Sequence, residues 1–145
     1  MATKPKKILV KKQRPKRLHR SKFETNFNEL CKEEGFDLGY ETSVLPFTTE
    51  VQKRRYIPDW TIKQGWYIET KGRLVAADRR KMLYIKQQHP EARILVVFQR
   101  YQNKLYPGSP TTYGEWATKN DIEWCAYQDK YIWLEFIQEA LGIKV

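Results

Sequence analysis

Residues Tyr56 to Gly72 read Tyr-Ile-Pro-Asp-Trp-Thr-Ile-Lys-Gln-Gly-Trp-Tyr-Ile-Glu-Thr-Lys-Gly and are the most informative segment of this 145-residue chain. Two apolar runs of β-forming residues are separated by Lys63-Gln64-Gly65. A short glycine-containing segment between two such runs predicts a β-hairpin. With these three residues as the loop, Ile62 faces Trp66 across the hairpin, and this pair sets the register of every pair farther out.

The register of this hairpin brings two acidic side chains together. Counting outward in pairs places Asp59 opposite Glu69, and directly opposed side chains have Cβ atoms about 5 Å apart. Because side chains alternate between faces, Glu69 and Lys71 share a face and Thr70 points away. Two facing carboxylates repel, and Mg²⁺ between them would remove the repulsion, since this cation prefers oxygen ligands. The lysine could orient or deprotonate a water, or stabilise charge that develops on a phosphorane.

The same pattern has a plainer interpretation, a surface hairpin whose charged side chains only contact solvent. A slip of one residue in the pairing would also move Asp59 to the opposite face of the hairpin. The spacing by itself favours neither interpretation, so the choice depends on the rest of the sequence.

Length and composition predict a single domain over residues 21–145. Hydrophobic residues make up 41% of the chain and aromatic residues 14%, as is typical of a protein with a packed core. No apolar run approaches the roughly 18 residues of a membrane span. The basic N-terminus lacks the apolar segment of a secretory signal.

Cysteine and histidine provide no metal-ligand or triad pattern. Cys31 and Cys125 lie in apolar surroundings, so we expect two buried free thiols in a reducing cytoplasm, with one disulfide as the alternative. Only two histidines are present, which favours neither a zinc site nor a Ser-His-Asp triad.

The excess positive charge lies at the start of the chain. The formal net charge is +10, and residues 1–22 contain ten Lys or Arg and no acidic residue, so the remainder is neutral. Such a run binds polyanions, nucleic acid above all, with salt-dependent and largely sequence-independent affinity. We predict a flexible basic arm over residues 1–20, with a solubilising or localisation tail as the alternative. The residues expected to contact DNA are Lys16, Arg17, Arg20, Lys22, Lys53, Arg54 and Arg55.

Helical and strand patterns surround the hairpin and predict an α/β protein. We expect helices over 21–34, 76–88, 113–119 and 131–141, and strands over 40–51, 93–98 and 122–126. Ser21 and Glu24 form a capping box for the first helix. Pro46 in the first of these strands favours an edge position, a bend or a bridge to another subunit. The apolar run 93–98 suits a strand buried on both faces, reached through a crossover helix.

The acidic hairpin and the order of the elements resemble the restriction-endonuclease-like nuclease core, a mixed central sheet flanked by helices. Its signature matches Pro58-Asp59 followed by Glu69-Thr70-Lys71. Further motifs are Ser21-x-x-Glu24, Tyr56-x-Pro-Asp59, Glu69-Thr-Lys-Gly72, Gln88-His-Pro90, Lys104-Leu-Tyr-x-Gly-Ser-Pro-Thr111 and Tyr113-Gly-Glu115. As an ordered set over about residues 20–125, they resemble the phage endonuclease I family, the junction-resolving enzymes of short-tailed phages.

The resemblance implies a metal-dependent endodeoxyribonuclease that cleaves branched DNA, four-way (Holliday) junctions above all. The catalytic residues would be Glu24, Asp59, Glu69 and Lys71. The metal ligands would be Asp59, Glu69, Glu24 and the Thr70 backbone carbonyl. One or two Mg²⁺ ions, replaceable by Mn²⁺, would assist in-line attack of water on a DNA phosphodiester.

The resemblance also implies an intertwined, domain-swapped homodimer. In it, Glu24 completes the partner's site and the strand with Pro46 bridges the halves. The expected setting is the cytoplasm of an infected bacterial host, with no membrane and no small-molecule cofactor involved. Two alternatives stay open: a sequence-specific or nicking endonuclease on the same core, and a non-catalytic DNA-binding protein.

Overall fold

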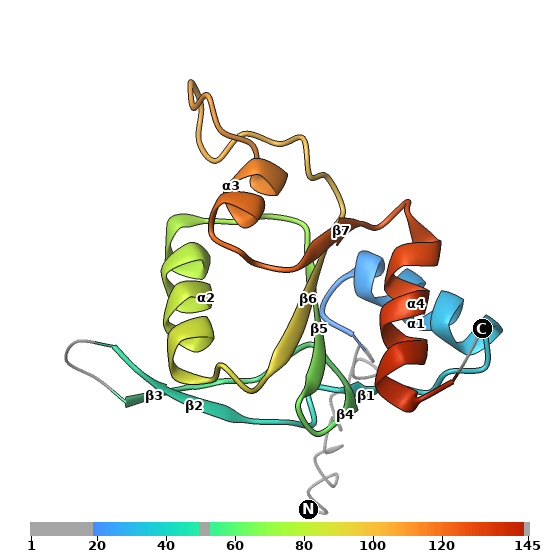
Figure 1. Ribbon diagram of the computed structural model, residues 1–145. Coiled ribbons are helices and arrows are strands. Elements are labelled where there is room, and N and C mark those ends of the chain that lie inside the picture. The colour runs from blue at the N-terminus through green and yellow to red at the C-terminus, as the bar shows by residue number, and fades with distance from the viewer. Residues whose placement is uncertain (1–18, 50–52, 144–145) are drawn as a thin grey trace, which may run out of the picture.

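The computed structural model describes residues 19–49 and 53–143 (Figure 1). Within them, the helices are α1 (Lys22–Glu33), α2 (Ala76–Gln88), α3 (Tyr113–Lys119) and α4 (Lys130–Leu141). One sheet contains β1 (Gly39–Tyr40), β4 (Trp60–Lys63), β5 (Trp66–Lys71), β6 (Arg93–Phe98) and β7 (Trp124–Ala126). A second, two-stranded sheet contains β2 (Leu45–Thr48) and β3 (Lys53–Tyr56).

The larger sheet is mixed, as predicted. Its strand order is β1-β4-β5-β6-β7, in which β4 pairs antiparallel with β1 and β5, whereas β6 pairs parallel with β5 and β7. Parallel neighbours cannot be joined by a tight turn, so α2 carries the chain from the end of β5 back to the start of β6. This crossover places the first turns of α2 beside the carboxyl end of β5.

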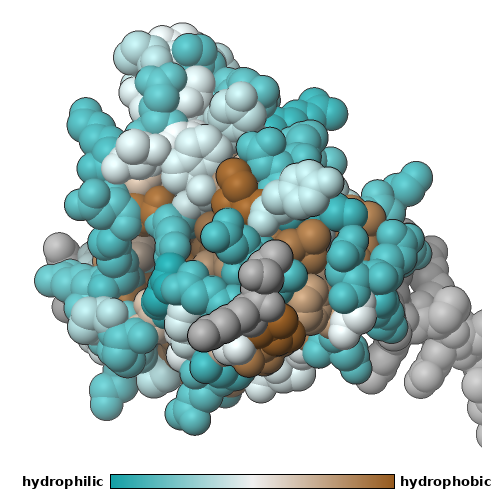
Figure 2. Space-filling model, turned by 45° about the vertical axis from the view of Figure 1, so that its right-hand side comes forward, coloured by the Kyte–Doolittle hydropathy of each residue, from teal (hydrophilic) through white to brown (hydrophobic). Residues whose placement is uncertain are grey.

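Helices cover both faces of the sheet (Figure 1), with α1 and α4 on one face and α2 and α3 on the other. Strand β6 contributes apolar side chains to both faces. Leu95 and Val97 pack into a cluster with α1 and α4, which we call the α1–α4 core, whereas Val96 and Phe98 pack with α3. All four are at most 2% exposed, which explains the uninterrupted apolar run in the sequence. Hydrophilic side chains cover most of the face in Figure 2, with hydrophobic ones showing between them.

The hairpin keeps its predicted register away from the loop but not beside it. The outer pairs are those expected: Trp60 with Ile68, and Thr61 with Tyr67. The predicted pairing of Ile62 with Trp66 is wrong, because Trp66 pairs with Lys63 and the register shifts between Thr61 and Lys63. A two-residue loop with Gly65 at φ +90° suits the twist of a hairpin, and the extra residue is absorbed as a bulge.

The remaining helices and strands agree with the sequence except before the hairpin. Helix α1 is capped by Ser21, whose Oγ accepts a hydrogen bond from the Glu24 amide at 3.1 Å. The single strand expected over 40–51 is wrong: the chain breaks between β1 and β2, beginning at Glu41, whose φ is +52°. Pro46 lies opposite Arg55 in β2, which has β3 as its sheet partner, so the predicted edge position is confirmed. Residues 50–52 lie outside the described part.

The two cysteines are free and buried, as predicted, and the disulfide alternative is wrong. Burial raises the pKa of both thiols, Cys31 and Cys125, to about 12, so neither is a thiolate near neutral pH. No helix in the described ranges is long and apolar enough to cross a membrane.

Candidate active site

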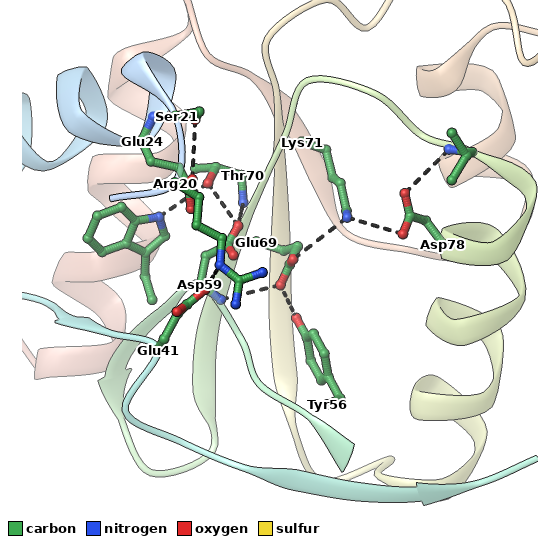
Figure 3. A network of polar contacts seen from close by, with 12 residues as sticks. Arg20, Ser21, Glu24, Glu41, Tyr56, Asp59, Glu69, Thr70, Lys71 and Asp78 are labelled. Atoms are coloured by element: carbon green, nitrogen blue, oxygen red, sulfur yellow. Dashed lines mark hydrogen bonds and ion pairs between the residues drawn. The ribbon is translucent and has the colours of Figure 1, made fainter. Parts of the chain in front are cut away.

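A cleft of about 530 Å³ opens where β5 ends and α2 begins. Its acidic and basic side chains form a row that runs from α1 to α2 in Figure 3. The members of this row, which define what we call the acidic cleft, are Glu24, Asp59, Glu69, Lys71 and Asp78. The four residues predicted as catalytic are therefore brought together by three separate segments of the chain.

Glu69 lies at the centre of the acidic cleft and is 6% exposed. Its Oε2 accepts a hydrogen bond from the Tyr56 hydroxyl and another, at 3.4 Å, from the Asp59 backbone amide. Its Oε1 lies 3.9 Å from Lys71 Nζ. Tyr56 belongs to a sequence motif that predicts no role for its side chain. In the structure, its buried hydroxyl fixes the orientation of the Glu69 carboxylate.

Asp59 lies just before β4 and reaches across to β5. Its Oδ2 accepts two hydrogen bonds from Thr70, one from the backbone amide and one from the hydroxyl, both at 2.9 Å. Asp59 was expected on the face of Glu69 and Lys71, with Thr70 pointing away from that face. Its carboxylate instead bonds to Thr70, because Asp59 precedes β4 and the alternation of faces does not extend to it. Among the described residues, none donates a hydrogen bond to Asp59 Oδ1, so this oxygen is open to the cleft.

Glu24 reaches the acidic cleft from the first turn of α1. Its Oε1 accepts a hydrogen bond from Ser21 Oγ at 3.2 Å, and its Oε2 accepts one from the Tyr40 hydroxyl at 3.0 Å. The Tyr40 oxygen in turn accepts from the Arg20 backbone amide at 2.9 Å. Within the single chain described here, Glu24 thus lines the same cleft as Asp59.

Lys71 is held between two carboxylates. Its Nζ lies 3.9 Å from Glu69 Oε1 and 3.5 Å from Asp78 Oδ1, and its side chain is 16% exposed. Asp78 lies in the first turn of α2 and is not among the residues predicted for the site. Its contact with Lys71 depends on how α2 returns to the sheet after β5, and no periodicity in the sequence reports that.

Burial and mutual repulsion disfavour the charged forms of the central carboxyls. Burial, followed by the nearby charge of Asp59, raises the pKa of Glu69 to about 8, and the Lys71 ammonium only partly opposes this. Burial, followed by the charge of Glu24, raises the pKa of Asp59 to about 6, against the lowering effect of the two Thr70 hydrogen bonds. The cleft therefore has less positive charge than its carboxylates require.

The donor chemistry of the acidic cleft fits a hard divalent cation. Asp59 and Glu69 each use one oxygen for hydrogen bonds, and the other faces the cleft or Lys71. Carboxylate oxygens are preferred ligands of Mg²⁺, and added positive charge would lower both raised pKa values. In the part of the chain that is described, no group of three or more His, Cys, Asp or Glu side chains has the arrangement of a preformed metal site.

The basic residues predicted to contact DNA lie at several places. Lys53, Arg54 and Arg55 are exposed on β3, and Arg55 lines the acidic cleft. Arg20 also lines the cleft and forms an ion pair with Glu41 at 2.8 Å, while Lys22 is exposed at the start of α1. Lys16 and Arg17 lie outside the described residues.

Comparison with known proteins identifies the family of this chain. The family model described as phage endonuclease I matches residues 2–144. Endonuclease I of Escherichia phage T7 is 38% identical over 120 residues, which cover 83% of this chain and 78% of that protein. Endodeoxyribonuclease 1 of Enterobacteria phage T3 is 37% identical over 123 residues, which cover 85% and 79%. The chain belongs to the phage endonuclease I family.

Proposed function

We propose that this protein is a structure-selective endodeoxyribonuclease that resolves four-way junctions and other branched DNA by hydrolysing phosphodiester bonds. The observation that carries the proposal is the meeting of Glu24, Asp59, Glu69 and Lys71 in one cleft. Family membership supports nuclease activity. The expected place of action is the cytoplasm of the infected bacterium, where phage DNA is processed.

The proposed cofactor is Mg²⁺, with Mn²⁺ as a substitute. Asp59 and Glu69 would hold it, together with Glu24 and the Thr70 backbone carbonyl. When bound, such an ion activates water as a nucleophile and stabilises charge on the leaving oxygen. Tyr56 and the Thr70 amide and hydroxyl hold the two central carboxylates in place, so the ligands are oriented before the ion arrives.

The side chains of the cleft then act on water and phosphate. Lys71, fixed between Glu69 and Asp78, directs its ammonium toward the attacking water or the scissile phosphate. The water oxygen attacks phosphorus in line with the bond to the 3′ oxygen. That bond breaks, and the proton lost by the water is balanced by protonation of the 3′ oxygen. Arg55, exposed beside the cleft, would hold the backbone of the DNA electrostatically.

The proposed architecture is a restriction-endonuclease-like core over residues 21–145, preceded by the basic arm over residues 1–20. The mixed sheet, the acidic hairpin and the crossover helix α2 support it. We propose further that two chains exchange their α1 segments, with the strand that contains Pro46 as the bridge. Glu24 would then line the cleft beside Asp59 of the partner subunit, whereas its contacts with Ser21 and Tyr40, which precede the bridge, would stay within one chain. A twofold dimer would cut both strands of a twofold junction.

The test compares an immobile four-way junction with a linear duplex of equal length, each incubated with Mg²⁺ and with EDTA, on a denaturing gel. Paired cuts on opposing strands of the junction, absent from the duplex and from EDTA, are expected. Equal cutting of both substrates would favour a general or sequence-directed nuclease. A junction that is bound on a native gel but never cut would favour the non-catalytic DNA-binding alternative.

A further inference from the structure

Two lysines line the acidic cleft, and their surroundings differ. Lys71 is held between two carboxylates. Lys81, from the second turn of α2, lies with its Nζ 5.7 Å from the centre of the Tyr56 ring, and none of the described carboxylates comes within 4 Å of it. Lys81 is half-buried, and its ammonium rests on an aromatic face beside the cleft, where its charge partly opposes the raised pKa of Glu69 without forming an ion pair.

Lys81 also lines a second hollow. This groove of about 500 Å³ lies between the β2–β3 hairpin and the first half of α2, and we call it the α2 groove. Arg54 lines it from β3, and Arg80 and Tyr84 line it from α2. Asp78 and Lys81 line both hollows, so the acidic cleft and the α2 groove adjoin each other.

The charge of the α2 groove is the reverse of that of the acidic cleft. Among the described residues, its charged lining consists of Arg54, Arg80, Lys81 and one acid, Asp78, which is paired with Lys71. Strand β3 supplies a cation to each hollow, because Arg54 lines the groove and Arg55 lines the cleft. A hollow that gathers cations and begins at a phosphodiester-cleaving site has the chemistry of a track for a DNA backbone.

The groove has fixed walls. The Gln88 side chain at the end of α2 accepts a hydrogen bond from the Thr48 amide at 2.7 Å and donates one to the Thr48 carbonyl at 2.5 Å. The adjacent His89 ring is hydrogen-bonded to the Pro46 carbonyl. Phe47 and Tyr56 of the hairpin pack against Ile85 of α2 in one buried cluster. These contacts hold the hairpin against α2. The backbone segments that carry Arg54 and Arg80 on either side of the groove are therefore fixed relative to each other.

We propose that the α2 groove binds the cleaved DNA strand beyond the scissile phosphate, with Lys81 on the nearest flanking phosphate and Arg80 on one farther along. This inference rests on the proposed function, since the strand enters the groove from the acidic cleft. It assigns to Lys81 a role separate from that of Lys71. Lys81 holds an unreactive phosphate and thereby orients the strand, whereas Lys71 acts at the reacting one.

The test removes the charge from each side of the contact in turn. Junction binding is measured with a Glu69→Gln protein, with and without Lys81→Ala, on junctions that carry one neutral methylphosphonate at successive positions on either side of the mapped cut. At the flanking phosphate, the methylphosphonate should weaken binding by the protein with Lys81 roughly 10-fold and have no effect on the Lys81→Ala protein. Lys81→Ala should also make the negative slope of log K against log salt less steep, by about 0.9.

Two further variants make the result specific. Lys81→Gln keeps the alkyl stem over Tyr56 and should behave like Lys81→Ala. Arg80→Ala should instead remove sensitivity at a position farther from the cut. Lys119→Ala, which removes an exposed lysine on α3, should leave the sensitivity of the near phosphate unchanged.

Two results would overturn the inference: uniform sensitivity to methylphosphonates around the cut, or full sensitivity at every position after Lys81→Ala. If the wild-type protein cuts the junction with Mg²⁺, either of these binding results would leave the proposed function intact. If the wild-type protein does not cut, the proposed function fails first and the groove loses its basis.

Discussion

The α1–α4 core and the centre of the acidic cleft both contain buried side chains, yet of opposite kinds. Helix α1 contributes to both: Phe27 and Cys31 face the core, and Glu24 faces the cleft. Every member of the core is apolar, so burial there lowers the free energy of the folded state. In the cleft, burial raises the pKa of Glu69 and Asp59 instead, which means that their charges destabilise the folded chain.

The α1–α4 core therefore stabilises this protein, whereas the acidic cleft contains the residues that we propose carry out cleavage. A change in the core should reduce stability and leave the chemistry of the folded fraction intact. A change in the cleft should reduce cleavage by the folded protein and leave its stability intact.

Glu69→Gln should have the largest effect on activity. We expect cleavage of a four-way junction to fall more than about 1,000-fold, well beyond the 10–100-fold typical of residues that only support a metal ligand. Junction binding should stay equal or become tighter, and the urea midpoint should not fall, because a neutral amide replaces an acid that burial disfavours as an anion. A lower midpoint would show that Glu69 stabilises the fold, and loss of binding together with cleavage would count against a catalytic role.

Trp133→Ala should have the largest effect on stability. Trp133 is fully buried in the α1–α4 core, and its ring centroid lies 4.7 Å from that of Phe27. Removing it should lower the free energy of unfolding by about 3–5 kcal/mol. Urea denaturation followed by circular dichroism measures this. Tyr131→Ala on the same helix is the matched control: Tyr131 is 84% exposed, so a change within about 0.5 kcal/mol is expected.

The pH dependence of stability should also distinguish the cleft from the core. The folded-state pKa of Glu69 is raised from an ordinary 4.5 to about 8, so between these values the folded protein holds a proton that the unfolded chain has lost. In EDTA, the wild-type protein should therefore lose stability relative to Glu69→Gln as pH rises from about 4.5 to 8, by up to about 1.4 kcal/mol per pH unit. Added Mg²⁺ should reduce the loss. A difference that stays constant across this range would contradict the raised pKa.

The sequence predicts those parts of the molecule that are periodic or local. The bounds of α2 and β6 are as expected, because Pro90 follows the end of α2 and a continuous apolar run fills the buried strand β6. The closeness of Asp59 and Glu69 follows from a hairpin whose outer register survives a change at the loop. These features need only the physics of neighbouring residues.

Contacts between segments that meet only after folding could not be predicted. Lys71 and Asp78 meet because the loop after β5 returns α2 to the sheet, and Glu24 of α1 accepts a hydrogen bond from Tyr40 of β1, sixteen residues later. The role of Tyr56 was missed for a related reason. The sequence shows Tyr56 as part of the Tyr-x-Pro-Asp motif, but the direction of its hydroxyl depends on how the β2–β3 hairpin packs.

Tyr56→Phe tests how far the support of one carboxylate matters. The substitution keeps the ring under Lys81 and removes the hydroxyl that donates to Glu69 Oε2. Loss of such a partner typically weakens metal affinity or activity 10–100-fold. We expect the half-saturating Mn²⁺ concentration, measured both by calorimetry and by cleavage, to rise within this range while the urea midpoint changes little. An unchanged Mn²⁺ affinity would assign Tyr56 to packing alone.

The smallest expected effect comes from the two helix caps. Ser21 Oγ accepts from the Glu24 amide at 3.1 Å and donates to the Glu24 carboxylate, while Thr112 Oγ1 does the same for Glu115 at the start of α3. Replacing either by alanine should cost about 1 kcal/mol in the free energy of unfolding.

The two caps share their geometry and differ in what the capped glutamate does. Glu24 lines the acidic cleft, and Glu115 does not. Ser21→Ala should therefore also slow cleavage, by a few-fold, because the Glu24 carboxylate keeps the Tyr40 hydroxyl as its remaining donor. Thr112→Ala, with the same loss of stability, should cut at the wild-type rate. Measured together at equal folded fraction, the pair separates the contribution of a cap to the helix from its contribution to the site. Equal rates for both variants would mean that the orientation of Glu24 is set without Ser21.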